Sequence, residues 1–171
     1  MSAESPIPTR LVIDFRDPTQ AQGWTSVDDQ VMGGVSASQV QATPAGLVFS
    51  GEVSLANNGG FASSRARPRD YGLAGATALI LRLQGDGQTY KFGMRTDDAF
   101  DGVQYQARVT TQAGEWLEVP LPLSAFQPSF RGRLVPAPPL DPTRIRVFGL
   151  LIADRQAGPF RLLVESLQAR F

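Results

Sequence analysis

The chain has 171 residues, 16 basic and 16 acidic side chains, no net charge, and neither histidine nor cysteine. This length suits one domain. The absence of cysteine excludes a disulfide framework and a thiolate nucleophile, and the absence of histidine excludes the Ser-His-Asp and Cys-His triads. A neutral chain with a sequence pI of about 6.2 lacks the basic excess of nucleic-acid-binding proteins. We therefore expect no nucleic-acid partner.

We expect no targeting signal at the start of the chain. Residues 1–9 contain one acidic residue and two prolines, and they lack the apolar stretch of a secretory signal peptide. No apolar run approaches the about 20 residues of a membrane-spanning helix. We expect an N-terminal arm at 1–9, one domain at 10–171, and a cytoplasmic protein that does not span a membrane.

Alternation of apolar and polar residues recurs along the chain, whereas helical periodicity is almost absent. In chain order, the predicted strands are 11–16, 35–43, 46–55, 60–67, 79–84, 90–95, 103–109, 115–121, 144–153 and 159–168. A tight hairpin is predicted at 84–88 and a short helical turn near 124–126. Residues 147–152 are apolar at both odd and even positions, so both sides of this strand would be apolar. This predicts a central strand covered on both faces. This pattern predicts an all-β fold, an antiparallel β-sandwich or jelly roll.

The loop at 24–36 contains two adjacent carboxylates, Asp28 and Asp29, and a glycine pair, Gly33 and Gly34. Adjacent carboxylates can bind calcium, or act as acid and base when their pKa values are driven apart. However, neighbouring side chains of an extended chain point to opposite sides, and carboxylates in turns often accept backbone N–H groups. We therefore predict a structural loop, with no bound metal and no cofactor.

Two further loops are candidates for binding. The first contains Asn57, Asn58 and Phe61; these residues suit a hairpin bend, or they face a ligand. The second is the proline-rich stretch at 127–142, with Arg131 and Arg133 at its tip, which we expect to be the most mobile ordered part of the chain.

A polar sheet face is the third candidate. The predicted strands 79–84, 90–95 and 103–109 follow one another, so adjacent pairing is expected. Pairing would merge their polar positions into one patch, formed by Arg82, Lys91, Arg95, Gln104, Gln106 and Arg108. Such a patch is either a solvated sheet face or a site for an anionic or hydroxyl-rich partner.

Several motifs distributed over about residues 10–168 occur together. They are Trp24 with 27–36, the segment 49–63, Gly85-Asp86-Gly87, Gly114-Glu115-Trp116, 130–133, 149–154 and 158–160. This combination resembles the complex I intermediate-associated protein 30 family, the domain of a mitochondrial assembly factor for NADH:ubiquinone oxidoreductase. The resemblance implies a galactose-binding-domain-like jelly roll. The chain lacks that factor's mitochondrial extension, so we expect a bacterial protein.

Three functions are compatible with these observations. The first is a non-catalytic interaction module or assembly chaperone that binds a protein partner, such as a respiratory-complex subunit. The second is a carbohydrate-binding module of the galactose-binding-like class. The third is an enzyme that uses Asp28, Asp29 and Asp154, but glycosidic chemistry needs two carboxyl groups about 5–9 Å apart, and no such pairing is evident. We favour the first function and leave the oligomeric state open.

Overall fold

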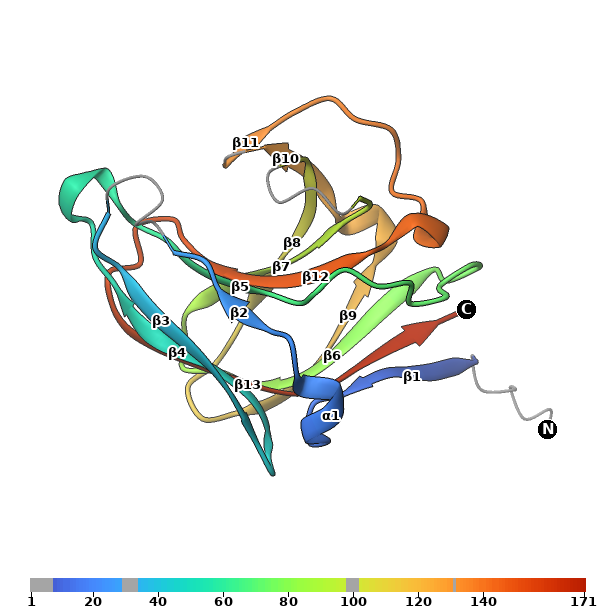
Figure 1. Ribbon diagram of the computed structural model, residues 1–171, viewed down its shortest axis with the longest axis horizontal. Helices are drawn as coiled ribbons and strands as arrows, with labels where there is room; N and C mark the ends of the chain where they lie inside the picture. Colours follow the sequence, from blue (N-terminus) through green and yellow to red (C-terminus); the bar gives the residue numbers. More distant parts are fainter. Residues whose placement is uncertain (1–7, 29–33, 98–101, 131) are drawn as a thin grey trace, which may run out of the picture.

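The computed structural model describes residues 8–28, 34–97, 102–130 and 132–171. They form two antiparallel sheets that pack face to face (Figure 1). Sheet A has the strand order β3 (Ala37–Thr43), β4 (Gly46–Val53), β13 (Gly158–Arg170), β6 (Ala78–Gln84) and β9 (Trp116–Pro122), and β1 (Thr9–Asp14) also pairs with β13. Sheet B has the order β11 (Arg133–Leu134), β10 (Gln127–Phe130), β8 (Gln104–Thr110), β7 (Thr89–Arg95), β12 (Val147–Ile152), β5 (Ala62–Arg65) and β2 (Thr25–Ser26).

Helical structure in the described ranges is limited to single turns. These are α1 (Pro18–Ala21), η2 (Ala56–Asn58), η3 (Leu123–Ala125) and η4 (Pro142–Arg144). The turn η3 confirms the helical turn predicted near 124–126. None of these helices is long and apolar enough to cross a membrane.

The core fills the space between the sheets. Alternate residues of each strand point inward, as the period of two predicts. Phe49 of sheet A packs edge-on against Phe160, with ring centroids 4.9 Å apart, and Phe92 of sheet B stacks on Phe148 at 5.4 Å. All four side chains are buried. The predicted all-β antiparallel sandwich is confirmed.

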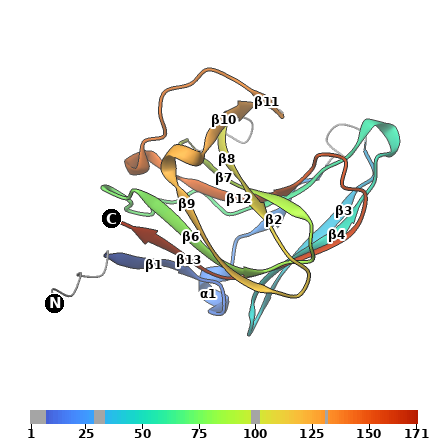
Figure 2. The same cartoon turned by 180° about the vertical axis from the view of Figure 1, so that it is seen from behind.

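The predicted hairpin at 84–88 is wrong. This segment leads the chain from sheet A into sheet B, so β6 pairs with β13 and β9, whereas β7 pairs with β8 and β12 (Figure 2). The carboxylate of Asp86 holds the crossover. Its Oδ1 accepts hydrogen bonds from the backbone N–H of Gln88 and the hydroxyl of Tyr90, and its Oδ2 accepts one from the backbone N–H of Arg161. A short turn between alternating strands can therefore join two sheets as well as two strands of one sheet.

The strand β12 lies between β7 and β5, at the centre of sheet B, as the apolar run predicts. Phe148, Leu150 and Ile152 point into the core. The residues that alternate with these face outward, and among them Gly149 and Leu151 are only partly buried. Val147, which also faces outward, is buried. The expected cover of the outer face is therefore only partial, and this face forms part of a groove.

Candidate functional site

The outer face of sheet B is ordered in rows by the register of β5, β12, β7 and β8. The middle row contains Arg65, Gly149, Gly93 and Gln106, each directly opposite the next. The row on one side contains Ser63, Leu151, Lys91 and Arg108. On the other side, Val147 lies opposite Arg95, and Gln104 lies two residues from Gln106 along β8.

Two glycines in the middle row create a hollow in this face. Gly149 and Gly93 lie opposite each other on neighbouring strands, so no side chain rises from the centre of the sheet. Glycine inside a strand commonly marks a place where a ligand or another backbone approaches closely. The groove over this floor has a volume of about 510 Å³, which is within the range of small-ligand sites.

The walls of the groove are polar and mainly cationic. Among the described lining residues, the charged side chains are Arg65, Lys91, Arg95 and Asp154. Arg95 is 7% exposed, and its guanidinium donates a hydrogen bond to the carbonyl of Gly102 at 3.0 Å. The amides of Gln104 and Gln106 line the β8 side, and Phe61 and Ser63 line the β5 side. The groove can thus offer several hydrogen-bond donors to a ligand.

The carboxylate of Asp154 lies at one end of the groove. It is 3.5 Å from the ammonium of Lys91 and 3.4 Å from the guanidinium of Arg108. Its side chain is 41% exposed, and exposed pairs of this kind contribute at most about 1 kcal/mol. Asp154 therefore neutralises part of the cationic face without being held there by strong ion pairs.

The loop that carries Asp154 adopts an unfavourable backbone conformation. Asp154 and Arg155 both have φ of 59°, which is uncommon for two consecutive residues other than glycine. Gln156 holds the loop to sheet B, because its side chain accepts from the backbone N–H of Thr89 and donates to the carbonyls of Thr89 and Ala153, each at 2.8 Å. Strained residues of this kind concentrate at functional sites.

Most of the predicted polar face is present. Lys91, Arg95, Gln104 and Gln106 line the groove, and Arg108 lies on the same face beside Asp154. The prediction was wrong for Arg82, because β6 belongs to sheet A. Period-two alternation assigns a residue to a face of its own strand, but it does not say which sheet the strand joins.

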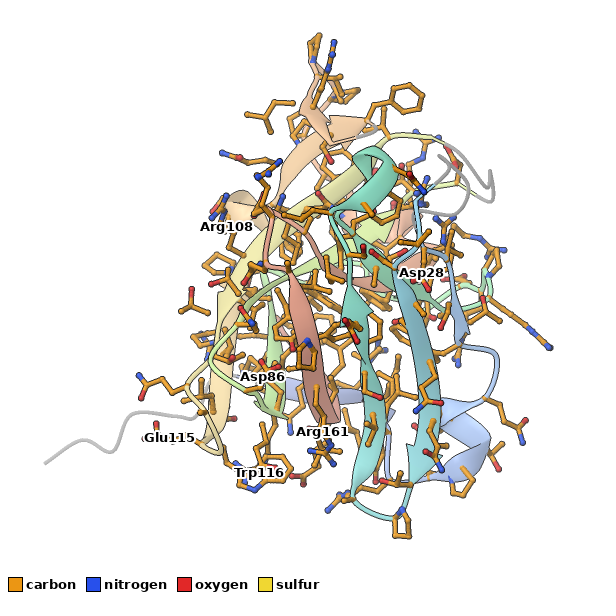
Figure 3. All side chains as sticks on the ribbon, turned by 90° about the vertical axis from the view of Figure 1, so that its left-hand side faces the viewer. Asp28, Asp86, Arg108, Glu115, Trp116 and Arg161 are labelled. Atoms are coloured by element: carbon orange, nitrogen blue, oxygen red, sulfur yellow. The ribbon has the colours of Figure 1, made fainter. Side chains whose placement is uncertain are left out.

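Arg82 lies on the outer face of sheet A. Its guanidinium is 2.9 Å from the carboxylate of Glu165 and 5.2 Å from the centre of the Trp116 ring. Trp116 is 40% exposed. Figure 3 shows Trp116 near the lower end of the molecule and Arg108 in its upper half, well apart from each other. Arg82 and Trp116 therefore mark a surface that is separate from the groove.

The predicted binding loops reach the groove in part. Phe61 is half-buried and lines it. Asn57 lies in η2 with φ of 55° and is exposed, and the backbone of Asn58 belongs to the same turn. Arg133 begins β11 and is exposed, whereas Arg131 lies outside the described residues.

The stretch that follows β11 is anchored. The hydroxyl of Tyr105 donates to the carbonyl of Pro138 at 2.6 Å, and the backbone N–H of Val135 donates to the carbonyl of Pro128 at 3.2 Å. Its mobility relative to the rest of the chain stays a prediction.

Asp28 joins the two sheets at one side of the sandwich. Its Oδ2 accepts from the backbone N–H of Ser38 at 2.8 Å, and its Oδ1 accepts from the Ser38 hydroxyl at 2.6 Å and from the backbone N–H of Ser63 at 3.2 Å. Ser38 belongs to β3 and Ser63 to β5, and Asp28 is 7% exposed (Figure 3). This geometry favours the predicted structural role of Asp28.

The rest of that loop is only partly described. Gly34 is buried, while Asp29 and Gly33 lie outside the described residues. Within the described ranges, no group of three or more acidic side chains lies where it could hold a metal ion. Both oxygens of Asp28 accept hydrogen bonds from the protein, which argues against its use as an acid or base.

Sequence reasoning missed Arg65, Gly93 and Gly149. The signal for the glycines was present, because each lies inside a predicted strand, and such a glycine suggests close approach of a ligand or backbone. Arg65 gave no signal, because its place opposite Gly149 depends on the pairing of strands far apart in the sequence.

Three comparisons relate this chain to known proteins. The family model described as "Complex I intermediate-associated protein 30 (CIA30)" matches residues 13–164. The mitochondrial complex I intermediate-associated protein 30 of Drosophila melanogaster is 26% identical over 92% of this chain and 61% of its own length. The Mus musculus protein of the same name is 26% identical over 92% of this chain and 55% of its own length. The chain thus spans somewhat more than half of these relatives.

Solved structures confirm the fold class. The family 11 carbohydrate-binding module from Clostridium thermocellum, in complex with a β-1,3-1,4-mixed-linked tetrasaccharide, superposes with a TM-score of 0.66 at 16% identity over 97% of each chain. The agarase AgWH50C matches with a TM-score of 0.61 at 12% identity over 95% of this chain and 24% of its own. At such low identity these matches concern the fold alone. The family match covers nearly the whole domain, and the chain belongs to the complex I intermediate-associated protein 30 family.

Proposed function

We propose that this domain is a non-catalytic binding module that assists assembly of respiratory complex I, and that it holds a partner protein in the groove of sheet B. The observation that carries the proposal is the groove itself, which has two facing glycines in its floor and polar and charged side chains in its walls. Membership of the family supports the assembly role. Both relatives are named as mitochondrial proteins. They therefore do not support the expectation that this chain is bacterial or cytoplasmic.

Carbohydrate binding is the second candidate. Gln104, Gln106 and the cationic side chains could bind sugar hydroxyls, and the groove occupies the open face of a sandwich. Ligand sites usually combine such groups with exposed aromatic rings. Among the described lining residues the aromatic side chains are Phe61 and Phe148, and Phe148 is 0% exposed. The groove therefore lacks a broad ring platform in its described part, which favours a protein partner.

The test is a gene replacement in the organism that encodes the chain. We expect deletion to lower the amount of assembled complex I on native gels and to accumulate subassemblies. Gly93→Leu should reproduce the defect. A Cβ at this position lies 3.2 and 3.3 Å from the flexible side chains of Gln106 and Gln104 and 3.4 Å from the backbone carbonyl of Tyr105, so the two glutamine side chains must move aside and the leucine fills the groove.

Arg82→Ala is the matched control, because it removes a cation from sheet A and leaves the groove intact. We expect normal complex I in this variant. Normal assembly in the deletion strain, together with binding of the purified chain on a glycan array, would contradict the assembly role and favour the carbohydrate alternative.

A further inference from the structure

A second pocket lies at one side of the sandwich. Its volume is about 430 Å³, which is within the range of small-ligand sites. It lies between β1 and α1 of the N-terminal part and the segment 66–71, which follows β5. Among the described residues, none lines both this pocket and the groove of sheet B. What this pocket binds therefore goes beyond the function proposed above.

The floor of the pocket is apolar. Ile13, Ala66 and Tyr71 line it and are buried. The ring of Tyr71 packs against Phe148, with ring centroids 4.6 Å apart, and Trp24 lines the pocket as a half-buried ring. The pocket therefore offers aromatic and aliphatic contacts to the apolar part of a ligand.

The phenol of Tyr71 supplies a hydrogen-bond donor. Its side chain is 7% exposed, yet its hydroxyl makes no hydrogen bond within the described residues. Burial raises the pKa of this phenol, and the charges of Arg69 and Arg146 only partly oppose the rise. The hydroxyl thus stays protonated at neutral pH. Because buried polar groups normally have a partner, a ligand oxygen in the pocket would supply the missing acceptor.

Two guanidinium groups add further donors. Arg67 and Arg69 are the charged residues of the described lining, and both are exposed. The guanidinium of Arg69 lies over the ring of Tyr71, 4.8 Å from its centre, and the side chain of Arg67 packs beside Gly23. Within the described part of the chain, neither arginine forms an ion pair. The adjacent Asp70 does not line the pocket, and its Oδ1 accepts a hydrogen bond from a backbone N–H.

We propose that this pocket binds the phosphate group of a small phosphate monoester. Arg67 and Arg69 are two residues apart, so their Cα atoms are at most about 7 Å from each other, and their long side chains can reach one anion. The two oxygens of a carboxylate match a single guanidinium fork, whereas the three terminal oxygens of a phosphate also serve a second guanidinium and the phenol of Tyr71. The organic part of the ester packs against Trp24 on the apolar floor.

The test follows the fluorescence of Trp24 in a Trp116→Phe background, which leaves one tryptophan in the chain. We expect phenyl phosphate to change this fluorescence saturably. Benzoate, which has the same ring but a carboxylate, should bind about tenfold more weakly. Arg67→Ala, Arg69→Ala and Tyr71→Phe should each weaken binding of phenyl phosphate about tenfold, as for one lost charge-assisted hydrogen bond.

Two controls separate lost contacts from lost structure. Tyr71→Phe keeps the ring that packs against Phe148, so we expect an unchanged Tm together with the weaker binding. Arg133→Ala removes an exposed arginine of β11, which lies at the opposite edge of sheet B from β2. We expect this variant to bind phenyl phosphate like the parent.

No response to phenyl phosphate, equal binding of benzoate, or equal binding by the parent and the three pocket variants would refute the proposal. Binding of inorganic phosphate alone would refute it in favour of the free anion. Binding of phosphatidic acid vesicles without a response to phenyl phosphate would refute it in favour of a lipid surface. The measurement involves no residue of the groove, so its failure is distinct from failure of the assembly role.

Discussion

Replacement of Asp28 by alanine tests the join between the two sheets. The substitution removes the acceptor of three hydrogen bonds, two from backbone N–H groups and one from a hydroxyl. Leaving a buried donor unpaired costs about 1–3 kcal/mol. Ser38 and Ser63 are half-buried, so water replaces part of the loss. We therefore expect the free energy of unfolding to fall by about 3 kcal/mol, near the low end of the summed penalties.

Thermal and urea unfolding measure this change. For a domain of this size, 3 kcal/mol corresponds to a lowering of Tm by about 6–12 °C. Ser38→Ala is the matched control, because it removes the hydroxyl but keeps both backbone donors paired with Asp28, and we expect a loss of about 1 kcal/mol. An Asp28→Ala variant that melts like the parent but loses a calcium-dependent rise in Tm would refute the structural role and support a metal site.

Three further predictions concern the crossover, the loop and the floor of the groove. Burial, followed by the charge of Asp86, raises the pKa of the Tyr90 phenol far above its usual 10.0. The folded state therefore holds this proton more tightly than the unfolded chain does. The contribution of Tyr90 to the free energy of unfolding is fully present below pH 10 and is lost as the pH rises above it. Phenolate absorbance of Tyr90 that appears at a clearly lower pH than unfolding followed by circular dichroism would contradict this. Gln156→Met removes two hydrogen bonds to Thr89 of sheet B and one to Ala153 of the same loop. We expect a loss of about 2 kcal/mol and faster proteolysis at 153–157, and unchanged cleavage would argue against the anchor. Gly93→Ala should raise the free energy of unfolding by about 0.5–1 kcal/mol, because the Gln106 and Gln104 side chains closest to the new Cβ are flexible and can move aside; urea unfolding that shows a less stable variant would contradict this account of the groove floor.

The β-sandwich could be predicted because apolar and polar residues alternate within individual strands, and this alternation can be read from a short stretch of sequence. Lys91, Arg95, Gln104 and Gln106 were assigned to one face for the same reason, and β7 and β8 do pair. The assignment of Arg82 failed because the turn at 84–88 has the composition of a hairpin, while the partner of β6 is β13, about eighty residues later. Arg65 was missed for the same reason, since its neighbour Gly149 is distant in sequence.

Several features of sheet B are unfavourable for folding, which is an argument for function. Glycine at Gly93 and Gly149 weakens a central pair of strands, since each costs about 0.5–1 kcal/mol relative to alanine. The φ values of Asp154 and Arg155 add further strain, and the exposed ion pairs of Asp154 are too weak to compensate for it. Sheet A also contains glycines with positive φ, Gly46 and Gly51 of β4, but there an added Cβ would collide with the carbonyl oxygens of Val164 and Ala37, so packing within the sheet explains both glycines. Natural chains depart from locally favourable choices mainly where function requires it. That these departures meet at the groove on sheet B supports its assignment as the binding site.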